Sequence, residues 1–264
     1  MTFTLSKRRL LQNAAVGLLC AIGNGSSVWA TPLADTVARI RPSIVLIGTY
    51  RATDSPRFRF LGTGFVVGKG THIITNAHVA GRPDALAQDE QALVVQVPAS
   101  NGDWAMHQAR VLEKSEAHDL ALLQMDGVAS PALKVAASHG VREGDDLAFT
   151  GFPIGGMLGF SPVTHRATVS SITTMALPSP SGQRLSARAI RSLRDGKIQI
   201  FQLDATAYPG NSGGPLFDPV SGEVLGVINM VLVKSTRESA LTQPSGITYA
   251  IPSRYVLEML QRNP

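Results

Sequence analysis

Cysteine is the scarcest residue type in this sequence. The single cysteine, Cys20, lies in an apolar stretch near the N-terminus, within a segment that we expect to be removed on export. The mature chain is therefore predicted to have no disulfide and no thiol chemistry. Stability must then come from a packed core, and 44% hydrophobic residues in 264 supply enough apolar side chain for one large all-β unit or two small lobes.

The sequence also lacks a long hydrophobic run. The longest candidate, Leu10–Ile22, is short and interrupted by polar residues and glycine, which disfavours a membrane-spanning helix. It follows the basic residues Lys7–Arg9 and precedes Val28–Ala30, which has the pattern of a signal-peptidase cleavage site. We predict that residues 1–30 are a signal peptide and that the protein is periplasmic or secreted in a bacterium, by the Sec or the Tat route. No stable membrane insertion is expected after cleavage.

The sequence also lacks a large surplus of charge of either sign. The formal charge of the chain is +5, and loss of the first thirty residues, with three basic and no acidic residues, leaves +2. This surplus is too slight to predict nucleic-acid binding. The histidines show no HExxH or paired spacing, so neither a metal nor a cofactor is expected. Gly62–Gly64 and Gly151–Gly156 lack the remaining residues of dinucleotide and phosphate loops.

Glycine and proline, in contrast, are plentiful, and they surround one serine. Ser212 lies in Tyr208–Leu216, between Gly210 and the pair Gly213-Gly214. Glycines permit the backbone conformations that leave a serine hydroxyl exposed while nearby backbone N–H groups point outward. Acyl-transfer chemistry needs that combination of a nucleophile and oxyanion donors.

Two further motifs supply the partners that such a serine needs. Thr75–Val79 places His78 at the end of an apolar run, and His118–Leu123 places Asp119 at the start of another. Each motif alone is more often a tight turn, a buried histidine or a capping aspartate. Their joint occurrence in the order His, Asp, Ser is that of the chymotrypsin-type serine hydrolases. We therefore predict that His78, Asp119 and Ser212 are catalytic.

These motifs, together with Gly246–Ser253, resemble the trypsin-like serine proteases of the Deg/HtrA type, and the likeness extends from about Val37 to Leu260. The resemblance implies an all-β fold of two six-stranded antiparallel barrels with a short C-terminal helix. It also implies an endopeptidase of the bacterial envelope. The printed chain stops about a dozen residues after the last predicted strand, so we expect the protease domain only, without a PDZ module.

The resemblance also implies roles for residues around the serine. The backbone N–H groups of Gly210 and Ser212 would form the oxyanion hole. Asn211 stands where animal trypsin-like enzymes have an aspartate that receives a new N-terminus, so activation by N-terminal insertion is not expected. No acidic side chain is found among the residues expected to line the primary specificity pocket, which favours cleavage after small or medium aliphatic residues. These residues are Thr206, Ala207, Ile228, Asn229, Met230 and Gly246.

Strand and turn signals predict the layout of the domain over residues 31–264. The N-terminal barrel spans about 40–125, a linker 126–140, the C-terminal barrel 141–251 and a helix 252–262, with Ser253 as its N-cap. Strands are predicted over 44–48, 64–67, 72–75, 93–97, 109–113, 120–125, 146–150, 165–172, 198–203, 215–217, 224–230 and 247–251. A short helix is predicted over 35–40. The basic segment 179–197 is predicted to be either a solvated loop or a regulatory one, with a helix over 186–195.

The sequence thus predicts an exported serine endopeptidase that acts on unfolded or damaged envelope proteins, with protein or peptide substrates as its partners. Two other functions stay open at this stage. One is a chaperone-like protein that holds clients on a protease fold, and the other is a serine esterase. Assembly into an oligomer through residues 31–43 is also left open.

Overall fold

The computed structural model describes residues 32–81, 86, 90–99, 101–155, 159–175, 198–229 and 246–264. The chain divides into two units, Met1–Thr31 and Pro32–Pro264, and all described residues belong to the second. The predicted signal peptide, the predicted helix over 186–195 and Met230 therefore lie outside the described residues. Within the described residues, no helix combines the length and the hydrophobicity that crossing a membrane needs.

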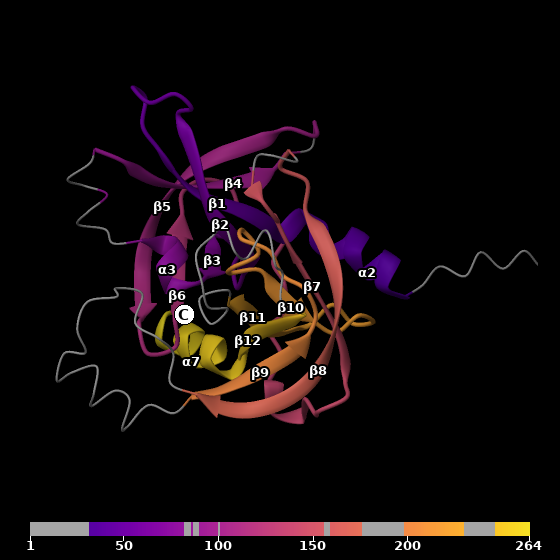
Figure 1. Cartoon of the computed structure of the whole chain (residues 1–264). Helices are drawn as coiled ribbons and strands as arrows, with labels where there is room; N and C mark the ends of the chain where they lie inside the picture. Colours follow the sequence, from indigo (N-terminus) through magenta and orange to yellow (C-terminus); the bar gives the residue numbers. More distant parts are fainter. Residues whose placement is uncertain are drawn as a thin grey trace, which may run out of the picture. The chain divides into compact units, whose positions relative to one another are not determined.

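The described strands form two closed six-stranded antiparallel barrels (Figure 1), which confirms the predicted fold class. The first barrel has the strand order β1-β2-β3-β6-β5-β4 and the second β10-β11-β12-β9-β8-β7. The first consists of β1 (Ile44–Tyr50), β2 (Phe58–Val67), β3 (His72–Thr75), β4 (Ala92–Pro98), β5 (Trp104–Ser115) and β6 (Leu120–Met125). The second consists of β7 (Asp146–Gly151), β8 (Val163–Met175), β9 (Ile198–Asp204), β10 (Pro215–Phe217), β11 (Val224–Asn229) and β12 (Ile247–Pro252).

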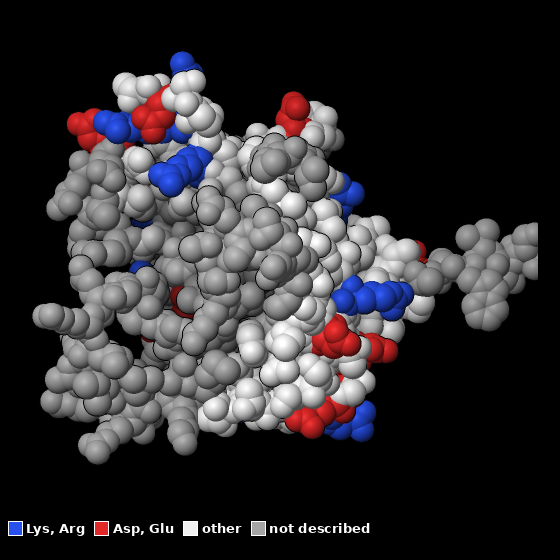
Figure 2. Space-filling view, in the orientation of Figure 1, with Lys and Arg blue, Asp and Glu red and all other residues white. Residues whose placement is uncertain are grey.

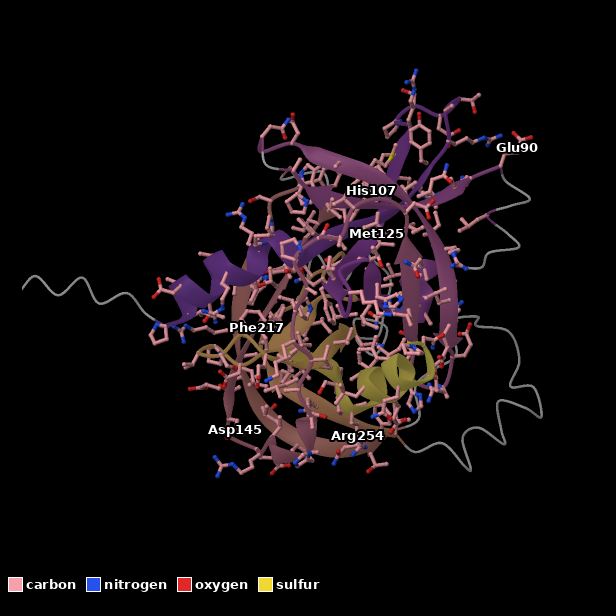
Figure 3. All side chains as sticks on the ribbon, turned by 180° about the vertical axis from the view of Figure 1, so that it is seen from behind. Glu90, His107, Met125, Asp145, Phe217 and Arg254 are labelled. Atoms are coloured by element: carbon pink, nitrogen blue, oxygen red, sulfur yellow. The ribbon has the colours of Figure 1, made fainter. Side chains whose placement is uncertain are left out.

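The alternation of side chains along β1 shows how the two barrels share a core. Val45 and Ile47 pack into the interior of the first barrel, whereas Ile44 and Leu46 face a second cluster that includes Phe217 from the other barrel. Successive residues of a strand point to opposite sides, so one buried strand serves both cores. Figure 3 shows Phe217 within the body of the molecule. The barrels are thus joined by an apolar interface, and any site at their junction is held from both sides.

Among the described residues, helices are few and short, and the C-terminal one ties the barrels together. They are α2 (Pro32–Ile40), η1 (Arg41–Ser43), α3 (Ala77–Ala80), η2 (Ser138–Gly140) and α7 (Arg254–Arg262). Helix α7 follows the second barrel, yet Arg262 near its end pairs with Glu113 of β5 at 2.6 Å. Val256 and Met259 of α7 are buried in the shared core.

Ser253 occupies the N-cap position of α7, but its side chain makes no capping hydrogen bond. Its hydroxyl donates instead to the backbone carbonyl of Ala136 in the segment that connects the two barrels. The predicted N-cap position of Ser253 is therefore confirmed, but its side chain does not make the capping hydrogen bond. The physical reason is the backbone of Ser253, which is helical (φ −62°, ψ −18°), whereas a capping hydroxyl typically needs an extended N-cap residue to accept from the first turn.

Charged residues on the face shown in Figure 2 lie mainly near its rim, with both signs side by side. Among the residues described on that face, no extended patch of one sign is visible. This distribution agrees with the small net charge expected of the chain without its first thirty residues.

Candidate active site

The segment that carries His78 is fixed by its buried neighbours. Strand β3 ends at Thr75, and Asn76 is extended before the single helical turn of α3. Ala77, Val79 and Ala80 of that turn are buried, while the side chain of His78 is 20% exposed. The buried alanines and valine thus anchor the backbone of this turn, and the imidazole of His78 is its partly exposed side chain.

Asp119 lies in the turn between β5 and β6, in an unusual backbone conformation. Its φ is +48°, in the left-handed region that a non-glycine residue seldom adopts and that aspartate tolerates better than most. Its carbonyl oxygen accepts hydrogen bonds from Asn76 Nδ2 at 3.0 Å and from Ala77 N at 3.1 Å. The residue is 5% exposed. These contacts hold the turn of Asp119 against the segment that bears His78.

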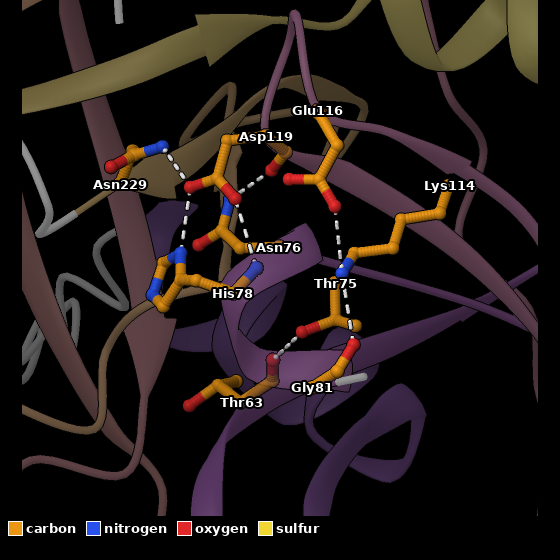
Figure 4. Close-up of polar contacts among 9 residues, drawn as sticks. All are labelled: Thr63, Thr75, Asn76, His78, Gly81, Lys114, Glu116, Asp119 and Asn229. Atoms are coloured by element: carbon orange, nitrogen blue, oxygen red, sulfur yellow. Dashed lines mark hydrogen bonds and ion pairs between the residues drawn. The ribbon is translucent and has the colours of Figure 1, made fainter. Parts of the chain in front are cut away.

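The carboxylate of Asp119 accepts three hydrogen bonds (Figure 4). His78 Nδ1 lies 2.6 Å from Oδ2, and the backbone N of His78 donates to Oδ1 at 2.9 Å. Asn229 Nδ2, from β11 of the second barrel, donates to Oδ2 at 2.8 Å. Because an ionised carboxylate only accepts, Nδ1 of His78 carries the proton and Nε2 of the neutral ring presents its lone pair.

The turn that carries Ser212 is pressed against the same region. The carbonyl oxygen of Ser212 accepts a hydrogen bond from Thr63 N at 2.9 Å. A Cβ added to Gly213 would collide with Thr63 O and Thr75 Oγ1, so only glycine fits there, and its φ is +85°. A Cβ on Gly62 would lie 2.8 Å from Val79 Cγ2 and 3.1 Å from Ser212 O. The structure thus brings the backbone of Ser212 beside the turn that bears His78.

Thr63 of β2 connects these parts and was not identified from the sequence. Its hydroxyl donates to Gly210 O at 2.6 Å and accepts from Phe152 N at 3.1 Å. Its carbonyl accepts from Thr75 Oγ1 at 2.7 Å, and the residue is fully buried. A small hydroxyl residue between two glycines of an apolar strand is the sequence signal that could have revealed it.

The loop after β7 packs directly on the backbone before Ser212. Gly210 has a φ of +105°, and a Cβ there would collide with Phe152 O. Ile154 N donates to Pro209 O at 2.7 Å. The loop after β7 therefore lies beside this site. The contacts orient the peptide on either side of Gly210, where the oxyanion hole is expected.

The residues expected to line a specificity pocket are placed in two groups. Thr206, Ala207 and Gly246 lie where β9 ends and β12 begins. There Ala207 N donates to Thr248 Oγ1 at 3.0 Å, and Ala205 N donates to Gly246 O at 3.0 Å. This network makes the three residues neighbours.

Ile228 and Asn229, at the end of β11, are engaged elsewhere. Ile228 N donates to Gly214 O, and Ile228 O accepts from Gly213 N, each at 2.9 Å. These backbone groups hold the turn of Ser212. The side chain of Asn229, fully buried, is turned to Asp119. In the described part of the chain, no group of three potential metal ligands is found.

Comparison with known proteins identifies this arrangement. The family model of the trypsin-like peptidase domain matches residues 62–227, a segment that contains His78, Asp119 and Ser212. The chain belongs to the trypsin-like peptidase family. It is 29% identical over 232 residues to serine protease HTRA1A of Danio rerio, covering 86% of this chain and 40% of that protein. It is 25% identical over 202 residues to a probable periplasmic DegP-like serine endoprotease of Ectopseudomonas mendocina, covering 76% of this chain and 35% of that protein.

Solved structures agree on the fold of this peptidase domain. Deg5 is 25% identical with a TM-score of 0.59, over 86% of this chain and 91% of that one. The HtrA-type protease AlgW with a tripeptide is 23% identical with a TM-score of 0.58, over 87% of this chain and 62% of that one. The domain is therefore a trypsin-like peptidase domain of the HtrA/DegP type. The chain spans about two fifths or less of the length of the curated relatives named above.

Proposed function

We propose that this peptidase domain is a serine endopeptidase that cleaves peptide bonds through Ser212, His78 and Asp119. The observation that carries the proposal is the hydrogen bond of 2.6 Å between His78 Nδ1 and Asp119, in a carboxylate site that both barrels complete. A histidine oriented in this way beside a serine in a glycine-rich turn is the arrangement that activates a hydroxyl.

The reaction follows from these positions. His78 Nε2 takes the proton of Ser212 Oγ as the oxygen attacks the peptide carbonyl carbon, and the carbonyl oxygen becomes an oxyanion. When the tetrahedral intermediate collapses, His78 gives that proton to the leaving amine, and an acyl group stays on Ser212. Water then attacks the ester, its proton passes to His78 and on to Ser212 Oγ, and the acid is released. Asp119 holds the ring and stabilises the imidazolium in both halves.

We assign the oxyanion donors to the backbone N–H groups of Gly210 and Ser212. Support comes from the contacts that fix this turn, above all Thr63 Oγ1 on Gly210 O. Loss of one such donor typically lowers turnover by ~10²–10³. We assign the primary pocket to Thr206, Ala207 and Gly246, with a wall from the end of β11. None of the described members is acidic, which supports small or medium aliphatic residues over Lys and Arg.

We infer further that the protein acts outside the cytoplasm on unfolded or damaged proteins of the bacterial envelope. The support is the signal-peptide pattern of residues 1–30 and the bacterial relatives, whose names describe periplasmic endoproteases. Unfolded clients suit this site because an extended chain exposes the peptide bonds that a serine endopeptidase must reach.

Reaction with a fluorophosphonate, followed by intact mass, tests the proposal. The wild-type protein is expected to gain one adduct, which is lost in Ser212→Ala and in His78→Ala. Cleavage of a chemically unfolded protein is expected to be lost in the same two variants. A folded wild-type protein that gains no adduct, with or without an unfolded client present, would overturn the assignment. An adduct without cleavage of protein, but with turnover of a small ester, would point to an esterase.

A further inference from the structure

His118 is a half-buried histidine that the proposed reaction does not use, although it directly precedes Asp119. Its ring stacks on Tyr255 of helix α7, with centroids 4.2 Å apart and an interplanar angle of 26°. Its Nδ1 shares a hydrogen bond of 2.9 Å with Ser115 Oγ at the end of β5. The stack fixes the plane of the ring, and the hydrogen bond fixes its rotation within that plane. A side chain held in two ways also holds its own backbone.

Tyr255 is itself firmly held. Its hydroxyl oxygen accepts from Arg254 Nη2 at 2.7 Å and from the backbone N of Gln199 in β9 at 3.1 Å. The guanidinium of Arg254 lies 4.7 Å from the centre of the Tyr255 ring. Arg254 stands at the start of α7 (Figure 3), and Arg262 at the other end pairs with Glu113 of β5. Tyr255, on which the ring of His118 stacks, is therefore anchored to both barrels.

The backbone at Asp119 needs such support because its φ of +48° is intrinsically unfavourable. On the C-terminal side, Asn76 and Ala77 bind its carbonyl oxygen. On the N-terminal side, the first residue with fixed side-chain contacts is His118. Release of either side would allow the turn to relax and the carboxylate to leave the ring of His78.

We propose that His118 is a positioning residue of the catalytic site, which clamps the Asp119 turn to the C-terminal helix and so aims the carboxylate at His78. This inference rests on the proposed function, since it assigns a role within the same triad. It makes α7, which follows the second barrel, part of the machinery that holds the aspartate of the first.

The surroundings of His118 favour a neutral ring. Burial is the leading cause that lowers the pKa of His118 below its usual value of 6.5, Arg262 and Arg254 lower that pKa further, and Glu258 opposes them. Arg262 is paired with Glu113 across the helix end. An uncharged imidazole can stack flat on tyrosine without desolvating a charge, which suits a structural clamp in this position.

The test compares four variants of the protein. His118→Ala removes the stack and the hydrogen bond, Tyr255→Leu removes the stack from the helix side, and His118→Phe restores an aromatic ring. Val256→Ala is the matched control, because Val256 is a buried residue of α7 that belongs to the shared core. It lowers stability without removing the ring contact. Each variant is assayed well below its melting temperature.

Two readouts follow for each variant. The first is the rate constant of fluorophosphonate labelling. It should fall by roughly 10- to 100-fold in His118→Ala and in Tyr255→Leu, the range expected when a catalytic group is slightly displaced. The second is the downfield proton resonance of His78 Nδ1, which reports the hydrogen bond to Asp119. It should shift or broaden in these two variants. His118→Phe should recover most of the rate, and Val256→Ala should retain both signals.

The inference is overturned when folded His118→Ala and Tyr255→Leu label at the wild-type rate and keep the His78 resonance. It is equally overturned when Val256→Ala lowers the rate as much as they do, because the effect would then reflect stability alone. Tyr255→Leu decides the matter where His118→Ala does not fold. The resonance needs no enzymatic activity, so a wild-type protein that does not label refutes the proposed function while the resonance still tests the clamp.

Discussion

Thr63 offers the sharpest test of how the two barrels jointly build the site. Thr63→Val keeps the shape of the side chain and removes its hydroxyl. Two groups then lose their partner: the part-buried carbonyl oxygen of Gly210, now bound at 2.6 Å, and the buried N–H of Phe152, bound at 3.1 Å. A buried polar group without a partner costs ~1–3 kcal/mol, so the pair gives roughly 2–6 kcal/mol. Since both lie in one network and are not additive, we expect a loss of about 2–4 kcal/mol in the free energy of unfolding.

The same change should also affect reactivity. Release of the Gly210 carbonyl frees the peptide unit between Gly210 and Asn211, which lies between the two proposed oxyanion donors, so fluorophosphonate labelling should fall by ~10-fold or more, towards the ~10²–10³ of a lost donor. Urea unfolding measures the stability, and labelling is followed in the absence of denaturant. Thr63→Ser is the matched control, since it keeps the hydroxyl and loses one methyl group, worth about 1 kcal/mol. Equal stability and equal labelling of the Val and Ser variants would refute the reasoning.

Two further predictions concern Asn229, which is fully buried, and His165, which is half-buried. Asn229→Ala removes a donor to the Asp119 carboxylate, so it should lower the free energy of unfolding by ~1.5–3 kcal/mol and slow fluorophosphonate labelling in parallel. Asn229→Asp adds a charge beside the carboxylate and should lower both the stability and the labelling rate further. Wild-type stability and labelling in both variants would contradict this prediction. His165 stacks on Phe149 at 4.8 Å, and burial lowers the pKa of His165 below its usual 6.5. The unfolded chain therefore binds a proton at this histidine more readily than the folded chain does. The free energy of unfolding should decline as the pH falls below the usual histidine pKa of 6.5. Urea unfolding over a pH series should show a shallower decline in His165→Phe.

Strand boundaries were predictable where the sequence ends a strand sharply. β3, β6 and β10 begin and end at the predicted residues, because polar or turn residues directly flank their apolar runs. β2 and β5 extend well beyond the predicted residues. In β5 no residue is fully buried and half-buried positions alternate with exposed ones along part of the strand, so its paired length does not appear as an apolar run.

The polar connections of the site could not be predicted in the same way. The resemblance implied that Asn229 lines the pocket. The direction of its amide depends on a carboxylate 110 residues away. Thr63 and Ser253 likewise bond to segments far along the chain. Motif spacing shows which residue types are present. It does not show which buried donor finds which acceptor, because that is set by the packing of the two barrels.

The origin of these contacts has a consequence for when the site exists. The first barrel supplies His78 and Asn76 to Asp119, the second barrel supplies Asn229, and Thr63 joins Ser212 to β2. Separation of the barrels would therefore break two hydrogen bonds together, that of Asn229 to Asp119 and that of Thr63 to Ser212. The proposed triad would lose its geometry before either barrel lost its own interior core. Under the proposed function, the domain then has no assembled site while its own chain is unfolded, and the interface that stabilises the fold also decides when the site exists.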